Sequence, residues 1–186
     1  IRAAAESSGA RFRYEATVGA GLPVITTLRD LVDTGDEILA IDGIFSGTLA
    51  WLFNKYDGQV PFSELVTQAR GMGYTEPDPR DDLSGVDVAR KLVILAREAG
   101  RELSLDQVTV ESLVPESLRD SSVEGFMAGL DTVDAAFAER LEQARARGAV
   151  LRYVARLSAD AAQVGLVELP ADHAFANLRL TDNVVQ

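Results

Sequence analysis

The sequence predicts an α+β fold, a single domain with a mixed, mostly antiparallel sheet and helices on one face. Some segments repeat apolar residues at helical spacing and others alternate them at period two, so both element types are expected. The predicted helices cluster beside strands that mostly follow one another in the chain, which is typical of this class. Of the 186 residues, 47% are apolar, enough for one core. No linker divides the chain, so residues 1–186 are expected to be one domain.

The first elements expected are a strand, a turn and a helix. Residues 12–18 alternate apolar and polar side chains, which predicts a half-buried strand. Two glycines in 19–21 end this pattern. Residues 22–35 have apolar positions at helical spacing, Pro23 in the first turn and a glycine at the end, which predicts a helix. A second strand is expected at 37–45.

Two helices and a charged loop are expected next. Ser46 is placed to cap a helix whose apolar residues share one face. Another helix is predicted to begin at Ser63 and to end near Gly71 or Gly73. The stretch 74–83 holds two prolines and five charged side chains, which predicts a loop.

A long helix is expected after this loop. Ser84 and Asp87 stand three residues apart, which is the spacing of a capping box. The apolar residues that follow recur at helical spacing, so the helix is predicted to continue to Gly100. Residues 108–113 are expected to form a short strand.

The last third of the chain is predicted to form a helix and a hairpin. Residues 131–147 have acidic side chains in the first turn and arginines in the last, and both stabilise the helix dipole. In residues 150–158 the side chains alternate between two faces, which predicts a strand. Residues 164–169 are expected to form the neighbouring strand. The two segments are therefore expected to pair as antiparallel strands, joined by a turn at 159–162.

Composition excludes several classes of function. The chain has 18 Lys and Arg against 29 Asp and Glu, and its net charge of −11 argues against nucleic-acid binding. It has no Cys, which excludes disulfides, thiol catalysis and cysteine-based metal sites, and its one histidine, His173, cannot form a His-rich metal site. No apolar run is long enough to span a membrane, and Ile1–Glu6 has no signal-peptide pattern. A cytoplasmic protein with no membrane partner is therefore expected.

The segment Val18–Val24 has two glycines between a predicted strand and a predicted helix. It departs from the dinucleotide-binding fingerprint, because Val24 stands where that motif has its third glycine and Pro23 removes an N–H group. Two interpretations remain open. One is a tight turn that needs glycine for positive φ. The other is a ring of backbone carbonyls around a hard cation, since such ions take oxygen ligands.

The loop Gly73–Gly85 places four carboxylates within seven residues, and its prolines stiffen the backbone that presents them. Such a group is able to bind a divalent metal, as in a metal-dependent hydrolase, or the amine of a small substrate. The spacing does not fit an EF-hand loop. A solvated acidic loop with Arg80 paired locally is the third alternative. The four carboxylates are Glu76, Asp78, Asp81 and Asp82.

Asp87 and Lys91 stand four residues apart and therefore share one face of the predicted helix. The acid precedes the base, which is also the order of an ordinary surface pair. Asp87 has a second structural role as part of the capping box. The functional alternative follows from the acidic loop directly before the helix, since a positioned lysine can act as a general acid.

Together these segments resemble the catalytic domain of homoserine dehydrogenase, in the form found in fused aspartokinase/homoserine dehydrogenases. The resemblance covers most of Phe12–Leu105 and is weaker beyond about Pro115. The segments that carry it are Glu15–Pro23, Gly43–Leu49, Gly73–Asp82 and Asp87–Lys91.

The resemblance implies an NADP- or NAD-dependent oxidoreductase that reduces aspartate β-semialdehyde to homoserine, reversibly, in threonine and methionine biosynthesis. It implies that Lys91 donates a proton to the carbonyl oxygen and that Glu76 and Asp87 hold the amino-acid substrate. Gly73 would lie against the cofactor.

The resemblance also implies a monovalent cation, sodium, as a second bound group. The family binds this ion through backbone carbonyls, and the matching positions are Glu15, Val18, Ala20 and Leu22. The cation interpretation of the glycine turn agrees with this assignment.

The chain departs from the family pattern at both ends. The family's nucleotide-binding domain and a second lysine precede the part that matches, and a segment that returns to that domain follows Asn183. We therefore expect residues 1–186 to be an excised piece, inactive alone, that dimerises or assembles further through an uncovered sheet face. A fused aspartokinase is a further expected partner. The alternative from another class is a non-catalytic binding or dimerisation module with the same fold.

Overall fold

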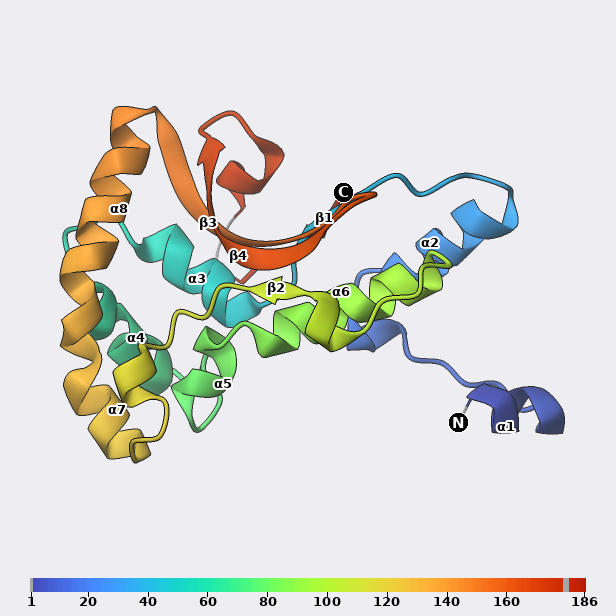
Figure 1. Cartoon of the computed structure of the whole chain (residues 1–186), viewed down its shortest axis with the longest axis horizontal. Coiled ribbons are helices and arrows are strands. Elements are labelled where there is room, and N and C mark those ends of the chain that lie inside the picture. The colour runs from blue at the N-terminus through green and yellow to red at the C-terminus, as the bar shows by residue number, and fades with distance from the viewer. Residues whose placement is uncertain (1, 179–180) are drawn as a thin grey trace.

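A five-stranded mixed sheet organises the computed structural model, which describes residues 2–178 and 181–186 (Figure 1). Its strand order is β2-β4-β3-β1-β5. β2 is parallel to β4 and the other neighbours are antiparallel, which confirms the predicted mixed, mostly antiparallel sheet. The strands are β1 (Ile41–Ile44), β2 (Thr109–Val110), β3 (Ala149–Leu157), β4 (Ala162–Pro170) and β5 (Val184–Val185).

Figure 1 shows α3 and α6 on one side of this sheet and α8 beside its end, where α8 contacts β3. The α-helices are α1 (Arg2–Ser8), α2 (Val24–Asp33), α3 (Gly47–Lys55), α4 (Phe62–Gly71), α5 (Pro79–Leu83), α6 (Val86–Glu98), α7 (Val123–Gly129) and α8 (Asp134–Ala146). Short 3-10 helices are η1 (Glu15–Thr17), η2 (Leu105–Gln107), η3 (Glu116–Leu118), η4 (Leu130–Val133) and η5 (Ala174–Asn177). Among the described residues, none of the helices has the length and apolar character needed to cross a membrane.

Alternation along β3 separates two hydrophobic clusters. Leu151, Tyr153 and Ala155 point into the large core formed with the helices. Val154 belongs to a smaller cluster with Phe175 of η5 on the other face. The chain itself thus covers part of the second face, and the partner expected on that face stays a prediction.

The second face also carries two polar anchors. The buried Arg152 donates hydrogen bonds to the backbone oxygens of Phe53, Phe175 and Ala176. His173 caps η5, because its Nδ1 accepts a 3.1 Å hydrogen bond from the backbone N–H of Phe175. These contacts fasten η5 to the sheet, and the histidine has a local structural role.

The strand predicted at 12–18 is wrong. This segment contains η1 and otherwise lies outside helices and strands. Phe12 is exposed, and the Glu15 carboxylate instead accepts backbone hydrogen bonds from the first turn of α2. Alternation alone does not form a strand when no neighbouring strand supplies hydrogen-bond partners.

Other boundaries differ in smaller ways. The predicted loop 74–83 contains the short α5, whose N-cap is Asp78. The strands predicted at 37–45 and 108–113 are reduced to β1 and β2, and α1, α7 and β5 were not predicted. The predicted helices after Ser46 and Ser63, the long helix to Gly100, the helix within 131–147 and the β3–β4 hairpin are confirmed.

The capping box predicted at Ser84 and Asp87 is wrong. The N-cap residue of α6 is Gly85, which makes no side-chain capping bond. Ser84 ends α5, where its backbone N–H donates to the carbonyl of Arg80. The backbone turns so sharply between the two helices that a left-handed glycine takes the capping position.

Candidate functional site

Lys91 and Asp87 form an ion pair at the start of α6. The Lys91 Nζ lies 2.8 Å from an Asp87 carboxylate oxygen and donates a second 2.8 Å hydrogen bond to the backbone oxygen of Phe45. The Lys91 side chain is 23% exposed and the Asp87 side chain 56% exposed. One helical turn separates the two residues, so the spacing in the sequence places them together as predicted. A carbonyl from the end of β1 adds a contact that the sequence did not reveal.

Asp82 anchors the loop that carries the candidate substrate residues. One carboxylate oxygen accepts a 2.8 Å hydrogen bond from the backbone N–H of Glu76. The other lies 2.8 Å from the Thr48 hydroxyl, which also lies 2.6 Å from the backbone oxygen of Tyr74. Thr48 is in the first turn of α3, so this contact joins α3 to the loop before α5.

The Asp82 carboxyl is partly buried, and this burial raises its pKa above the ordinary value of 3.8. A hydroxyl has one proton and donates to one acceptor at a time. The Thr48 hydroxyl therefore donates to either the Tyr74 carbonyl or the Asp82 carboxylate at any one time. Neither Thr48 nor the anchoring role of Asp82 was predicted. The sequence feature that could have indicated this contact is Thr48, a polar residue in the first turn of the helix that Ser46 caps. That helix start faces the acidic loop.

A polar cleft of about 540 Å³ lies beside this network. Glu76 and Asp87 both line it, so the structure brings the two predicted substrate residues to one place. Lys91 is not among the lining residues, and it pairs with Asp87, which is. We name the helices and turn at residues 79–91 the α5–α6 corner. The lining residues are Ser46, Glu76, Asp81, Asp82, Ser84, Val86, Asp87, Val88 and Arg90.

Gly73 lies where α4 ends, one residue after the C-cap Met72. Its φ is 72°, and the backbone N–H of Tyr74 donates to the carbonyl of Ala69, as in a common glycine-terminated helix end. A Cβ atom built on Gly73 would meet nothing within 4 Å. The backbone here is open to the approach of a planar group, which is the property that a cofactor contact needs.

Of the four acidic residues proposed as a divalent-metal cluster, Glu76, Asp81 and Asp82 line one cleft and Asp78 does not. Asp78 pairs at 2.7 Å with Arg80, whose guanidinium also binds the backbone oxygens of Arg119 and Ser121. The Arg80 side chain lowers the pKa of Asp78. Asp82 faces Thr48 instead. Within residues 2–178 and 181–186, no three His, Cys, Asp or Glu side chains are grouped to hold a metal ion.

The predicted cation segment forms what we name the Gly19 turn, residues 14–22. Gly19 and Ala20 both have positive φ, of 79° and 53°, so the backbone coils tightly here. Backbone oxygens are donors that suit a hard cation. Of the four predicted positions, Leu22 already accepts a 2.8 Å hydrogen bond at its carbonyl from the backbone N–H of Val24. Val18 is fully buried, so the turn is packed against the core.

Side chains hold the Gly19 turn from outside. The Glu15 carboxylate accepts hydrogen bonds from the Thr26 hydroxyl at 2.6 Å and from the backbone N–H of Ile25 at 2.8 Å. The Thr26 hydrogen bond is the main reason why the pKa of Glu15 lies below its ordinary value of 4.5. The Tyr14 hydroxyl donates at 2.7 Å to Glu98 near the end of α6. The side chain of Glu15 is therefore occupied, and only its carbonyl is left for an ion.

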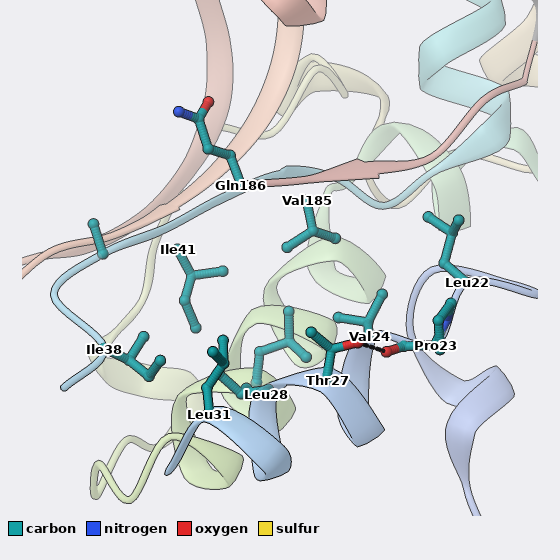
Figure 2. Close-up of a pocket in the computed structure, with 12 residues that line it drawn as sticks. Leu22, Pro23, Val24, Thr27, Leu28, Leu31, Ile38, Ile41, Val185 and Gln186 are labelled. Carbon is teal, nitrogen blue, oxygen red and sulfur yellow. Dashed lines mark hydrogen bonds between the residues drawn. The ribbon is translucent and has the colours of Figure 1, made fainter. Parts of the chain in front are cut away.

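An apolar cleft of about 340 Å³ lies next to the Gly19 turn. Figure 2 shows Leu28 and Leu31 of α2 facing Ile41 and Val185 across it. Its lining holds no acidic or basic side chain, so it differs in character from the cleft at the α5–α6 corner. The lining residues are Leu22, Pro23, Val24, Thr27, Leu28, Leu31, Ile38, Ala40, Ile41, Leu95, Val185 and Gln186.

The sequence was compared with known families and structures. The model of the homoserine dehydrogenase family matches residues 23–186. The chain belongs to the homoserine dehydrogenase family. This confirms the resemblance carried by the motifs at the α5–α6 corner and extends it to the C-terminal third, where the motifs had been weak.

The relatives of this homoserine dehydrogenase chain are longer proteins. It is 56% identical to the bifunctional aspartokinase/homoserine dehydrogenase 2 of Escherichia coli K12, over 99% of this chain and 23% of that protein. It is 48% identical to the homoserine dehydrogenase of Schizosaccharomyces pombe, over 98% of this chain and 51% of that protein. The chain thus spans between about a quarter and about half of these two relatives.

Solved structures agree with the fold of this homoserine dehydrogenase chain. A Candida auris protein of unknown function superimposes with a TM-score of 0.88 at 45% identity, over 92% of this chain and 50% of that one. A putative homoserine dehydrogenase from Archaeoglobus fulgidus has a TM-score of 0.77 at 28% identity, over 98% and 51%. The sheet and its helical layer are therefore a fold that the family shares.

Proposed function

We propose that this chain is the catalytic, substrate-binding and dimerising part of an NADP- or NAD-dependent homoserine dehydrogenase. In this proposal the longer enzyme interconverts aspartate β-semialdehyde and homoserine, a step toward threonine and methionine. The observation that carries it is the Lys91 ammonium, held between the Asp87 carboxylate and the Phe45 carbonyl beside the acidic cleft. Membership of the family supports the same reaction.

In this proposal the acidic residues bind the substrate and the lysine transfers the proton. The cleft carboxylates, Glu76 and Asp87, neutralise the ammonium group of the amino-acid substrate and orient it. Lys91 donates a proton to the carbonyl oxygen as negative charge develops there, and takes it back in the reverse reaction. Asp87 and Phe45 hold the direction of the lysine ammonium, because both accept its hydrogen bonds. A nicotinamide cofactor, when bound against Gly73, would supply the hydride chemistry.

The cofactor and the ion are included in this proposal because the backbone at two places is suited to bind them. The open backbone at Gly73 suits a nicotinamide ring that lies against it. The Gly19 turn would hold sodium through the carbonyls of Glu15, Val18, Ala20 and Leu22, and the positive φ values support such a ring of oxygens. We also propose a cytoplasmic homo-oligomer, with fusion to an aspartokinase as in the Escherichia coli relative.

Replacement of Lys91 tests the function. In the full-length enzyme, Lys91→Ala should lower kcat about 10²–10⁴-fold with an unchanged fold, since a positioned acid usually contributes that much. The assay follows NADPH oxidation with aspartate β-semialdehyde as substrate. Arg97→Ala is the matched control, because it removes a basic side chain from the last turn of the same helix, outside the cleft. A Lys91→Ala enzyme with normal kcat would favour the non-catalytic module.

A further inference from the structure

The backbone between α5 and α6 turns at Gly85, and this glycine is enclosed. Its φ is 72°, in the left-handed region that favours glycine. A Cβ atom built on Gly85 would lie 1.9 Å from the Tyr153 hydroxyl oxygen, 3.0 Å from Cζ of the same ring and 3.2 Å from a methyl carbon of Val110. The backbone of the turn therefore contacts the sheet directly, and a larger residue has to displace Tyr153.

Tyr153 is a rigid neighbour for this turn. It lies in the middle of β3 on the face that the helices cover, and it is 3% exposed. Its hydroxyl donates a 2.7 Å hydrogen bond to the backbone oxygen of Glu111. Burial raises the pKa of Tyr153, so the hydroxyl keeps the proton that this bond requires. Both the ring and its polar end are thus held in place by the sheet.

The turn at Gly85 separates the two halves of the candidate site. Asp82 precedes it and anchors the loop of Glu76, whereas Asp87 and Lys91 follow it on α6. The N-cap Gly85 has no side chain to cap α6, and the Ser84 hydroxyl accepts only a long, 3.4 Å hydrogen bond from the backbone N–H of Val86. The buried face of α6 holds the body of the helix, and the packing of the turn at Gly85 adds a contact at its first residues. A change in the direction in which α6 leaves the turn would move Lys91 relative to the Asp82 loop.

Building on the proposed function, we propose that Tyr153 and Gly85 are a positioning pair for the Lys91 proton donor. The Tyr153 hydroxyl meets a backbone that has no side chain, and this contact sets how α6 leaves α5. Tyr153 is 3% exposed and its hydroxyl is bonded to the backbone oxygen of Glu111, so it acts through α6 and not on the substrate. The identity of residue 85 and the hydroxyl of residue 153 are therefore coupled.

A double-mutant cycle in the full-length enzyme measures this coupling. Gly85→Ala should lower kcat about 10–100-fold, because a shift of an ångström in a catalytic group costs that much. Tyr153→Phe should lower kcat about 3–10-fold. The combined variant should recover about 10-fold over Gly85→Ala, since loss of the hydroxyl removes the closest contact of the new methyl group. KM should change less than about 3-fold throughout.

Gly100→Ala is the matched control. Gly100 follows α6 at its other end, with a φ of 78°, and a Cβ atom there would meet nothing within 4 Å. This variant has the same left-handed strain without the contact to Tyr153, and its kcat should stay within about 2-fold of wild type. Thermal unfolding of all variants separates a loss of stability from a loss of rate.

Amide hydrogen exchange gives a readout that needs no turnover. Exchange at residues 86–91 should rise in Gly85→Ala and return toward wild type in the combined variant. If the effects of the two substitutions on both kcat and exchange are strictly additive, the proposed coupling between Gly85 and Tyr153 is wrong. A wild-type enzyme that does not reduce the aldehyde contradicts the proposed function alone, because the exchange data still decide the coupling.

If Gly85→Ala does not fold, Tyr153→Phe alone tests the positioning role of Tyr153. A folded Tyr153→Phe enzyme with lowered kcat, unchanged KM and faster exchange at 86–91 supports the pair. Wild-type kcat and exchange in that variant would overturn it.

Discussion

The α5–α6 corner and the Gly19 turn are held in place in different ways. At the corner, several contacts join residues close in sequence, such as Lys91 with Asp87 and Asp82 with Glu76. The Gly19 turn depends on more distant partners: the Tyr14 hydroxyl binds Glu98, 84 positions along the chain. Spacing in the sequence therefore predicts geometry at the corner, whereas at the turn the geometry follows from contacts made by folding.

α6 links these two regions. It carries Lys91 and Asp87 in its first half and Glu98 as its last residue. The Glu98 side chain is 4% exposed and pairs at 2.7 Å with Arg29 of α2. One helix thus supports the local site at one end and the distant contacts of the turn at the other. Variants at the two ends test whether the regions respond separately.

The largest effect is expected for Asp82→Ala. This change removes the acceptor for the Glu76 N–H and the partner of the Thr48 hydroxyl. The free energy of unfolding should therefore fall by about 1–3 kcal/mol. Urea unfolding measures this change. Asp81→Ala is the control, an exposed aspartate of the same short helix, with an expected change below about 0.5 kcal/mol. Equal effects of the two variants would contradict the anchoring role of Asp82.

An intermediate effect is expected for Glu98→Gln. The change keeps the shape but removes the charge that Arg29 faces, and the stability should fall by about 1 kcal/mol because Arg29 is partly exposed. Exposed Glu102 supplies the control, since Glu102→Gln should be neutral within about 0.5 kcal/mol. Amide exchange should rise in residues 14–22 and not at the start of α6. Faster exchange at both ends would show that the two regions are not separate.

The smallest expected effect is that the contributions of two carboxyl groups to stability change with pH in opposite directions. Glu15 has a lowered pKa, so its contribution to stability is present above 4.5 and is lost as the pH falls through the folded-state pKa. Asp82 has a raised pKa, so its contribution is present below 3.8 and is lost as the pH rises through the folded-state pKa. Stability relative to Glu15→Gln should thus rise with pH in this range, and stability relative to Asp82→Asn should fall.

Carbon NMR titration of the two carboxyl groups checks these directions. The Glu15 midpoint is expected below 4.5 and the Asp82 midpoint above 3.8. An Asp82 midpoint below 3.8 would mean that its hydrogen bonds outweigh burial.

The sequence by itself determined the helices α2, α3, α4, α6 and α8, the β3–β4 hairpin and the family. These features depend on spacing over a few residues, because helix periodicity, caps and tight turns are set by neighbours in the chain. The pair of Asp87 and Lys91 was predictable for the same reason. The acidic loop was recognisable as a site, although its four carboxylates fit several interpretations.

The tertiary structure alone decided which distant groups meet this loop. Thr48 and the carbonyl of Phe45 come from other elements, and they contact Asp82 and Lys91. Tertiary contacts also turned the alternating segment 12–18 into a loop and placed Gly85 against Tyr153. The physical reason is that a hydrogen bond or a packing contact depends on distance in space, and residues far apart in sequence become neighbours only when the chain has folded.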